Sequence, residues 1–367
     1  MRIEDNPLEG FTPSYPLEQI APLEKLLFLD IETTGFTAAG SDLYLIGCAY
    51  YSAGVYHIRQ WFAENPLEQK EILESFFAFS SAFTHLIHFN GNTFDLPYLI
   101  QKCKQFDLSY DFGSFQGIDL YRRIAPYKTF LKLPNCKQKT IEYYLGIYRK
   151  DKYTGGELIQ VYKDYCSQPS TEQLFDLLLH NAEDLQGMLQ ILPILSYHDL
   201  FNGTLTAKRV QANYYTDMNG IRRQELMMKF SLPTSLPVCV TAMGKGCHFK
   251  GEAEEGTLLV PIYEEEMKYF YANYRDYYYL PSEDLALHKS IASFVDKDYR
   301  KQATASTCYT RKYSSFLPQW EIIGEPFFKR DYKSAELFFE LTDEIKKDRE
   351  LFSLYASHVL NELSLLC

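Results

Sequence analysis

The residues best suited to chemistry are two carboxylates, Asp30 and Glu32, which lie two positions apart between an apolar run, Leu26–Leu29, and Gly35. In a β-strand, residues i and i+2 point to the same face, so these two side chains would project together. Two bare carboxylates at close range resist joint ionisation. A divalent cation between them removes that penalty, and oxygen ligands suit Mg²⁺ or Mn²⁺. The alternative is a strand end that carries two solvated acids.

A second acidic motif follows an expected strand that ends at Asn90-Gly91. Asp95 falls in the first turn of a helix that we expect over Phe94–Phe106. Taken alone, an acid at that place favours the helix macrodipole and needs no catalytic role. Its interpretation therefore depends on the other motifs.

The third motif is His180 and Asp184, which lie four residues apart inside a helix expected over Thr171–Leu195. Residues at this spacing share one helix face. A lone histidine on a helix is more often structural than catalytic. This one lies one turn from an acid, on a face that could meet the first strand.

The elements that would position these residues are strands alternating with helices. We expect an irregular lead-in over residues 1–24, then a mixed α/β sheet flanked by helices. The expected strands are Leu26–Ile31, the hairpin Tyr44–Tyr51 and Val55–Phe62, Thr84–Phe89 and an edge near Ile118–Tyr121. Further helices are expected over Pro66–Phe79, Thr140–Tyr148 and Gly156–Cys166.

The texture of the sequence changes near residue 200. Arg209–Thr216 and Ile221–Leu232 flank a turn sequence, and short strands follow over residues 238–263. Helices are expected over Ser282–Val295 and Ser334–Leu366. We therefore expect a first domain over residues 25–199 and an α+β domain with antiparallel strands over residues 200–367, of unknown role.

Composition bounds the class of protein. A chain of 367 residues that is 46% hydrophobic can bury a large core, and no apolar run reaches the roughly 18 residues of a membrane span. The eight cysteines include no C-x-x-C pair, and Cys239, Cys247 and His248 fit no recognised zinc spacing. A cytoplasmic protein with reduced thiols, and no membrane partner, is expected.

Taken together, the motifs resemble the three exonuclease motifs of the DEDD superfamily, the DnaQ-like 3′–5′ exonucleases, which share a ribonuclease-H-like fold. The resemblance extends to the bacterial YprB-type predicted exonucleases and covers about residues 25–196. It is carried by Asp30-x-Glu32, Phe89-Asn90-Gly91…Phe94-Asp95, Ile118-Asp119-Leu120, Leu133-Pro134, Thr140-Ile141-Glu142, Leu145-Gly146, Arg149…Asp151, Gly155-Gly156 and His180-Asn181-x-x-Asp184.

This resemblance implies a phosphodiesterase that uses two Mg²⁺ or Mn²⁺ ions about 3.5–4 Å apart and no other small-molecule cofactor. Asp30, Glu32 and Asp184 would hold the first metal, and Asp30 would bridge to the second with Asp95. His180 would orient or deprotonate the attacking water. The residues implied near the substrate are Thr33, Asn90, Gly91, Phe94, Lys132, Lys139 and Arg149.

One departure from the superfamily concerns the base. Members with a catalytic histidine usually place it five residues before the last aspartate, and members with a tyrosine place it four before. Here His180 occupies the four-residue spacing, as in the YprB-type pattern. The metal ligands are therefore better supported than the base.

Charge and aromatic residues indicate where nucleic acid could bind. The net charge is -11, but the stretch from Arg122 to Lys152 is strongly basic, which suits a polyanion groove or merely a solvated face. Two aromatic stretches of the second half, Tyr269–Tyr279 and Thr307–Phe316, could stack on bases or pack within strands. Strand packing is the favoured alternative.

The sequence thus predicts a metal-dependent 3′–5′ exonuclease that acts on RNA or single-stranded DNA. The alternatives are a non-catalytic nucleic-acid-binding or adaptor protein that retains the fold, and a structural protein whose acids decorate its surface. A binding role does not need four acids and a histidine. No residue separates RNA from DNA.

Overall fold

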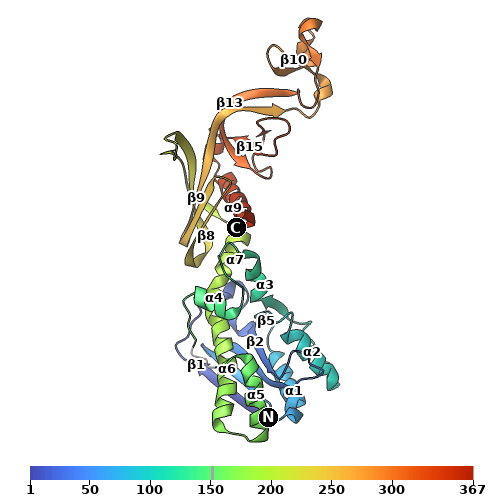
Figure 1. Ribbon diagram of the computed structural model, residues 1–367, viewed down its shortest axis with the longest axis vertical. Coiled ribbons are helices and arrows are strands. Elements are labelled where there is room, and N and C mark those ends of the chain that lie inside the picture. Colours follow the sequence, from blue (N-terminus) through green and yellow to red (C-terminus); the bar gives the residue numbers. More distant parts are fainter. Residues whose placement is uncertain (150–152, 367) are drawn as a thin grey trace. The chain divides into compact units, whose positions relative to one another are not determined.

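A computed structural model of the protein describes residues 1–149 and 153–366 (Figure 1). The chain divides into two compact units, Met1–His198 and Asp199–Cys367. No helix in the described part of the chain is long and apolar enough to cross a membrane.

The first unit is built on a six-stranded mixed sheet in the order β1-β4-β3-β2-β5-β6. The pairs β1/β4, β3/β4 and β2/β3 are antiparallel, whereas β2/β5 and β5/β6 are parallel. The strands are β1 (Arg2–Leu8), β2 (Leu26–Thr33), β3 (Leu43–Ser52), β4 (Val55–Phe62), β5 (His85–His88) and β6 (Gln116–Asp119). The strands expected between residues 26 and 121 are confirmed.

The lead-in prediction is wrong at its start, because Arg2–Leu8 forms β1 and pairs with residues 56–62 of β4. This strand lies at the sheet edge, where few of its side chains are buried. Its sequence can therefore be largely polar and contain Pro7, so it lacks the apolar pattern from which a strand is predicted.

Helices cover both faces of this sheet (Figure 1). Along β2, Leu27, Leu29 and Ile31 belong to a core shared with α1 (Gln69–Ser80) and α2 (Asp95–Gln105). Another core packs β3 and β4 against α5 (Gly155–Ser167) and α6 (Thr171–Gln190). The remaining helices are α3 (Leu120–Ile124), α4 (Gln138–Tyr144) and α7 (Leu195–Asn202), which begins in this unit and ends in the second.

The expected helices of the first unit are confirmed, with two changes. The helix predicted over Thr140–Tyr148 is shorter than expected, because α4 ends at Tyr144. The helix predicted over Thr171–Leu195 ends at Gln190, and a short 3-10 turn, Leu192–Ile194, precedes α7. Pro193 lacks the backbone N–H that a continuous helix would require, so the chain breaks there.

The second unit is dominated by antiparallel pairing. A six-stranded sheet has the order β14-β15-β13-β9-β8-β7, and a three-stranded sheet has the order β11-β10-β12. Their strands are β7 (Thr206–Thr216), β8 (Arg222–Gly244), β9 (Cys247–Phe270), β10 (Tyr277–Leu280), β11 (Leu285–His288), β12 (Lys301–Gln302), β13 (Tyr309–Gln319), β14 (Phe327–Phe328) and β15 (Leu337–Glu340). The helices are α8 (Lys289–Ala292) and α9 (Arg349–Leu366).

Two helix predictions fail in the second unit. Of Ser282–Val295 only α8 is helical, since Leu285–His288 pairs with β10. Of Ser334–Leu366 only α9 and the 3-10 turn Ile345–Lys347 are helical, since Leu337–Glu340 pairs with β13. Strand pairing, in a tight hairpin for β11 and with β13 for β15, overrides local helical periodicity in both places.

The two aromatic stretches of this unit pack largely among themselves. Tyr271 stacks on Tyr277 with ring centroids 4.5 Å apart, and both rings border a small core around Cys308. Phe270 packs edge-on against Tyr309. This arrangement favours strand packing over a stacking platform for bases.

Candidate metal centre

The alternation of β2 brings Asp30 and Glu32 to one face of the sheet. Their neighbours Leu29 and Ile31 point into the opposite core, so the two acids face α6 rather than the core. In the register with β3, Asp30 lies opposite Gly47 and Glu32 opposite Leu45. Asp30 and Glu32 therefore project from the same face of β2, as their two-residue spacing predicts.

Helix α6 presents the third motif to these acids. His180 Nε2 lies 3.4 Å from Asp184 Oδ2 and 3.8 Å from Glu32 Oε1. One ligand atom from each of Glu32, His180 and Asp184 lies within 4.8 Å of the other two. In the described part of the chain this is the group of His, Cys, Asp or Glu side chains that could hold a metal ion.

Asp95 reaches the same place from the first turn of α2. Its Oδ1 accepts a hydrogen bond from Ile31 N at 3.3 Å, so the carboxylate is fixed against the backbone between Asp30 and Glu32. The side chain is buried. All four carboxylates predicted from the motifs thus meet at one end of β2.

Burial and mutual repulsion of the carboxylates dominate the electrostatics of this cluster. Burial raises the pKa of Asp30 well above its ordinary value, and the charges of Asp184, Glu32 and Asp95 raise it further. Burial raises the pKa of Glu32 well above its ordinary value, and the charges of Asp184 and Asp95 raise it further. Burial also raises the pKa of Asp95 to about 7. A divalent cation would offset both the cost of burying the negative charges and the repulsion between them, so this set of oxygen donors fits Mg²⁺ or Mn²⁺.

Asn181 is a site residue whose role the sequence did not reveal, although it stands in the third motif. Its Nδ2 donates to Asp30 Oδ2 at 2.8 Å, and its Oδ1 accepts from Gln60 Nε2 at 2.9 Å. Gly47 makes room for it, because a Cβ there would lie 1.9 Å from Asn181 Oδ1. The buried amide therefore orients Asp30.

Arg149 is buried between two carboxylates, those of Glu142 and Asp184. Its side chain is 8% exposed, its Nε donates to Glu142 Oε2 at 2.6 Å, and its Nη1 forms an ion pair with Asp184 Oδ1. Gly187 leaves space for this pair, because a Cβ there would lie 2.4 Å from Glu142 Oε1. Arg149 thus holds Asp184 in place, and its contact with substrate stays a prediction.

Asn90 and Gly91 form the tight turn between β5 and α2. Asn90 adopts the left-handed conformation with φ 60°, and its N–H donates to Asp119 Oδ1 at 2.9 Å. Gly91 N donates to Nδ1 of the buried His88 at 3.1 Å. Asp119 and His88, from neighbouring parallel strands, therefore fix the turn that leads to Asp95.

Two further predicted residues lie beside this end of β2. Thr33 is the last residue of β2, and its hydroxyl donates to Gly35 O at 2.9 Å. Phe94 is the N-cap residue of α2. Its ring packs edge-on against Phe36, which follows Gly35 and is 91% exposed. Phe36 is a candidate base contact that the sequence did not single out, although an aromatic residue so close to the first motif was a usable signal.

The basic residues of the predicted groove are only partly placed. Lys132 is exposed in a left-handed turn with φ 56°, and Lys139 is exposed on α4. Lys152 and the Asp151 of the Arg149…Asp151 motif lie outside the described residues. Contact of Lys132 and Lys139 with substrate stays a prediction.

The comparisons with known proteins agree with the fold. Residues 27–196 match the family model of the RNase_H superfamily. The first unit therefore has an RNase H-like fold, and the predicted fold class, with its second antiparallel α+β part, is confirmed. Among curated proteins, none matches this chain.

Solved structures give distant similarities. The family B DNA polymerase of the archaeon Pyrobaculum calidifontis is 13% identical with a TM-score of 0.37, and the match covers 70% of this chain and 35% of the polymerase. The zinc-bound complex of E. coli exonuclease I with single-stranded DNA is 13% identical with a TM-score of 0.28, covering 57% of this chain and 55% of that one. The chain thus spans about a third and about half of these two proteins.

Proposed function

We propose that the protein is a metal-dependent nuclease, a 3′–5′ exonuclease that hydrolyses RNA or single-stranded DNA. The observation that carries this proposal is the convergence of Asp30, Glu32, Asp95 and Asp184, together with His180, at one end of β2 in an RNase H-like unit. Membership of the DEDD superfamily and of its YprB-type branch is part of the proposal.

Asp30, Glu32, Asp95 and Asp184 would hold the two Mg²⁺ or Mn²⁺ ions. When bound, such ions activate the attacking water and stabilise the leaving 3′-oxygen. Water then adds to phosphorus, the bond from phosphorus to the 3′-oxygen breaks, and a nucleoside 5′-monophosphate leaves with each turnover.

The residues of the chain supply position and proton transfer. His180 directs Nε2 into the carboxylate cluster, where it can accept a proton from the attacking water. Asn181 fixes Asp30 by a direct hydrogen bond, and Arg149 fixes Asp184 by an ion pair. The Asn90-Gly91 turn and the exposed ring of Phe36 lie beside the same end of β2, where they would meet the terminal nucleotide.

The test is digestion of end-labelled oligonucleotides, single- and double-stranded, of RNA and of DNA, by the full chain in Mn²⁺. A 5′-labelled strand should shorten stepwise from its 3′ end. Asp30→Asn should abolish this, whereas Asp164→Asn, which changes an exposed acid on α5, should not. Release of internal fragments would refute exonuclease action.

Metal binding needs a measurement that does not depend on turnover. Mn²⁺ should raise the unfolding temperature of the wild type and fail to do so in Asp30→Asn. Salt-sensitive binding of single strands without metal stabilisation or hydrolysis would instead identify a nucleic-acid-binding protein that retains the fold. The base is tested separately: near-wild-type kcat of His180→Ala in Mn²⁺ would exclude that role.

A further inference from the structure

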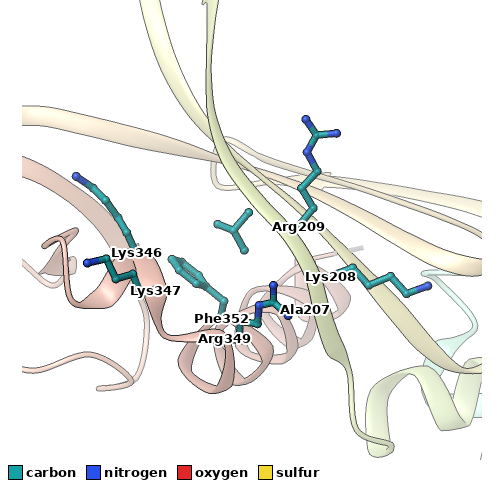
Figure 2. Close-up of a pocket in the computed structure, with 8 residues that line it drawn as sticks. Ala207, Lys208, Arg209, Lys346, Lys347, Arg349 and Phe352 are labelled. Atoms are coloured by element: carbon teal, nitrogen blue, oxygen red, sulfur yellow. The ribbon is translucent and has the colours of Figure 1, made fainter.

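The second unit contains a pocket of about 430 Å³ between β7 and the segment that enters α9 (Figure 2). Eight residues line it, all of them described, and none is acidic. Five of the eight are basic: Lys208, Arg209, Lys346, Lys347 and Arg349. This concentration is unexpected in a chain of net charge -11.

Two local features of the backbone create the pocket. The pairing of β7 with β8 passes from Ala207 opposite Phe230 to Arg209 opposite Lys229, so Lys208 is an extra residue in a β-bulge. Bulges redirect side chains locally and are common beside functional sites. Ala207 N also donates to Ser353 Oγ of α9 at 3.0 Å, which ties the strand to the helix.

The other basic residues come from the turn before α9. Lys346 and Lys347 end the 3-10 turn Ile345–Lys347, and Arg349 begins α9. Asp348 Oδ1 accepts from Leu351 N at 2.9 Å, so this carboxylate caps the helix. In Figure 2, Lys346 and Lys347 lie on one side of the pocket and Arg209 on the other, with the ring of Phe352 between them.

Two of these charges, Arg209 and Arg349, have no carboxylate partner in the described part of the chain, whereas the charge of Lys347 also acts on Asp343 and that of Lys208 on Glu255. Among the ion pairs of the described residues, Lys346 is joined to Asp343 at 2.9 Å, and the other four basic residues of the pocket appear in none. Five like charges around one cavity repel one another, and a bound polyanion would offset this repulsion. Binding of a polyanion there is therefore favourable.

The shape of the pocket indicates which part of a nucleic acid it would take. Phe352 is only 1% exposed, so its ring supplies packing and offers no face to a base. The exposed groups are ammonium and guanidinium ions, and guanidinium forms bidentate hydrogen bonds with phosphate. The pocket therefore suits a chain of phosphates and has no means of reading base sequence.

We propose that this pocket binds the sugar-phosphate backbone of a single-stranded nucleic acid, independently of sequence. The choice of nucleic acid, rather than another polyanion, rests on the nuclease function proposed for the first unit. The second unit would then add affinity for the strand that the metal centre hydrolyses.

The test measures binding of the full chain to a fluorescein-labelled oligo-dT by anisotropy, in EDTA to prevent hydrolysis, over a series of salt concentrations. In the variant Lys347→Gln/Arg349→Gln the affinity should fall at least about fivefold at low salt. The plot of log K against log salt should become shallower by about 1.4, since each single-strand phosphate contact contributes about 0.7. A matched control, Lys297→Gln/Lys333→Gln, removes two exposed charges of the same unit that lie outside the pocket.

Equal losses in the two double variants, or no loss in either, would overturn the proposal. So would pocket-dependent binding to phosphatidylserine vesicles together with unchanged oligonucleotide binding. The outcome is separable from the nuclease proposal. A chain that hydrolyses nothing, yet loses oligonucleotide affinity only in the pocket variant, supports the pocket and refutes the nuclease. A chain that hydrolyses oligonucleotides, but whose affinity for them is unchanged in the pocket variant, refutes the proposal for the pocket and leaves the nuclease proposal standing.

Discussion

Asn181 provides the sharpest test of how the metal centre is organised. Its amide is fully buried and donates to Asp30 Oδ2 at 2.8 Å. This hydrogen bond lowers the pKa of Asp30 against the larger effects of burial and neighbouring acids, which raise it. In Asn181→Ala the pKa of Asp30 should therefore rise further, and a proton should compete more strongly with the metal.

The magnitude follows from the type of interaction. A hydrogen bond to a charged group is worth about 1.5–3 kcal/mol, and loss of such a supporting contact commonly weakens metal binding about 10- to 100-fold. We expect a weakening of this size for Mn²⁺ at neutral pH, with part of the affinity recovered at higher pH. The free energy of unfolding of the metal-free protein should fall as well, because Gln60 also loses a partner.

The assay is titration of Mn²⁺ against the unfolding temperature, followed by hydrolysis as a function of Mn²⁺ concentration. Leu177→Ala is the control, since it removes a fully buried side chain of the same helix that belongs to the core with Tyr44 and Phe62. It should destabilise the unit without changing the Mn²⁺ midpoint. An unchanged midpoint in Asn181→Ala, or an equal change in both variants, would refute the reasoning.

Three other predictions follow from the same centre. The pKa of Asp95 is raised from 3.8 to about 7, so as pH rises its carboxyl group ionises in the unfolded state before it ionises in the folded state. The unfolding temperature of the metal-free protein should therefore fall between about pH 4 and pH 7. A smaller fall is expected in Asp95→Asn. Gly187→Ala should displace Glu142 and lower the free energy of unfolding by about 1–3 kcal/mol, measured by denaturant unfolding. An unchanged free energy of unfolding would mean that the side chains around Gly187 move aside without cost. Phe36→Ala should leave the unfolding temperature unchanged and raise KM for oligonucleotides about 5- to 150-fold, since stacking is worth about 1–3 kcal/mol per base. An unchanged KM would exclude stacking by Phe36.

The sequence predicted the first unit well because local patterns there agree with the tertiary structure. The alternation around Asp30 and Glu32 reports a strand with two different faces, and the four-residue spacing of His180 and Asp184 reports one helix face. The contact between Asn181 and Gly47 was beyond prediction, because it depends on how α6 lies across the sheet. The strand Arg2–Leu8 was missed for a related reason: at a sheet edge it buries little, so its sequence carries no apolar pattern.

The second unit shows where sequence patterns fail. Leu285–His288 and Leu337–Glu340 read locally as parts of helices, but the first forms a hairpin with the preceding strand β10 and the second pairs with β13. The basic pocket was equally hidden, since Lys208 and Lys347 are far apart along the chain and meet only through a bulge and a turn.

The alternation of core and site residues along β2 affects how much intact protein should accumulate in a cell. Leu27, Leu29 and Ile31 are part of the core, while Asp30 and Glu32 lie on the other face of the strand among the proposed metal ligands. The ligands therefore converge only when this strand is folded, so bound metal would favour the native state over any partly opened one. At a free metal concentration 100 times the Kd, this linkage is worth about 2.7 kcal/mol. Metal starvation should then reduce how much intact protein accumulates as well as its turnover, because proteases act on the opened form.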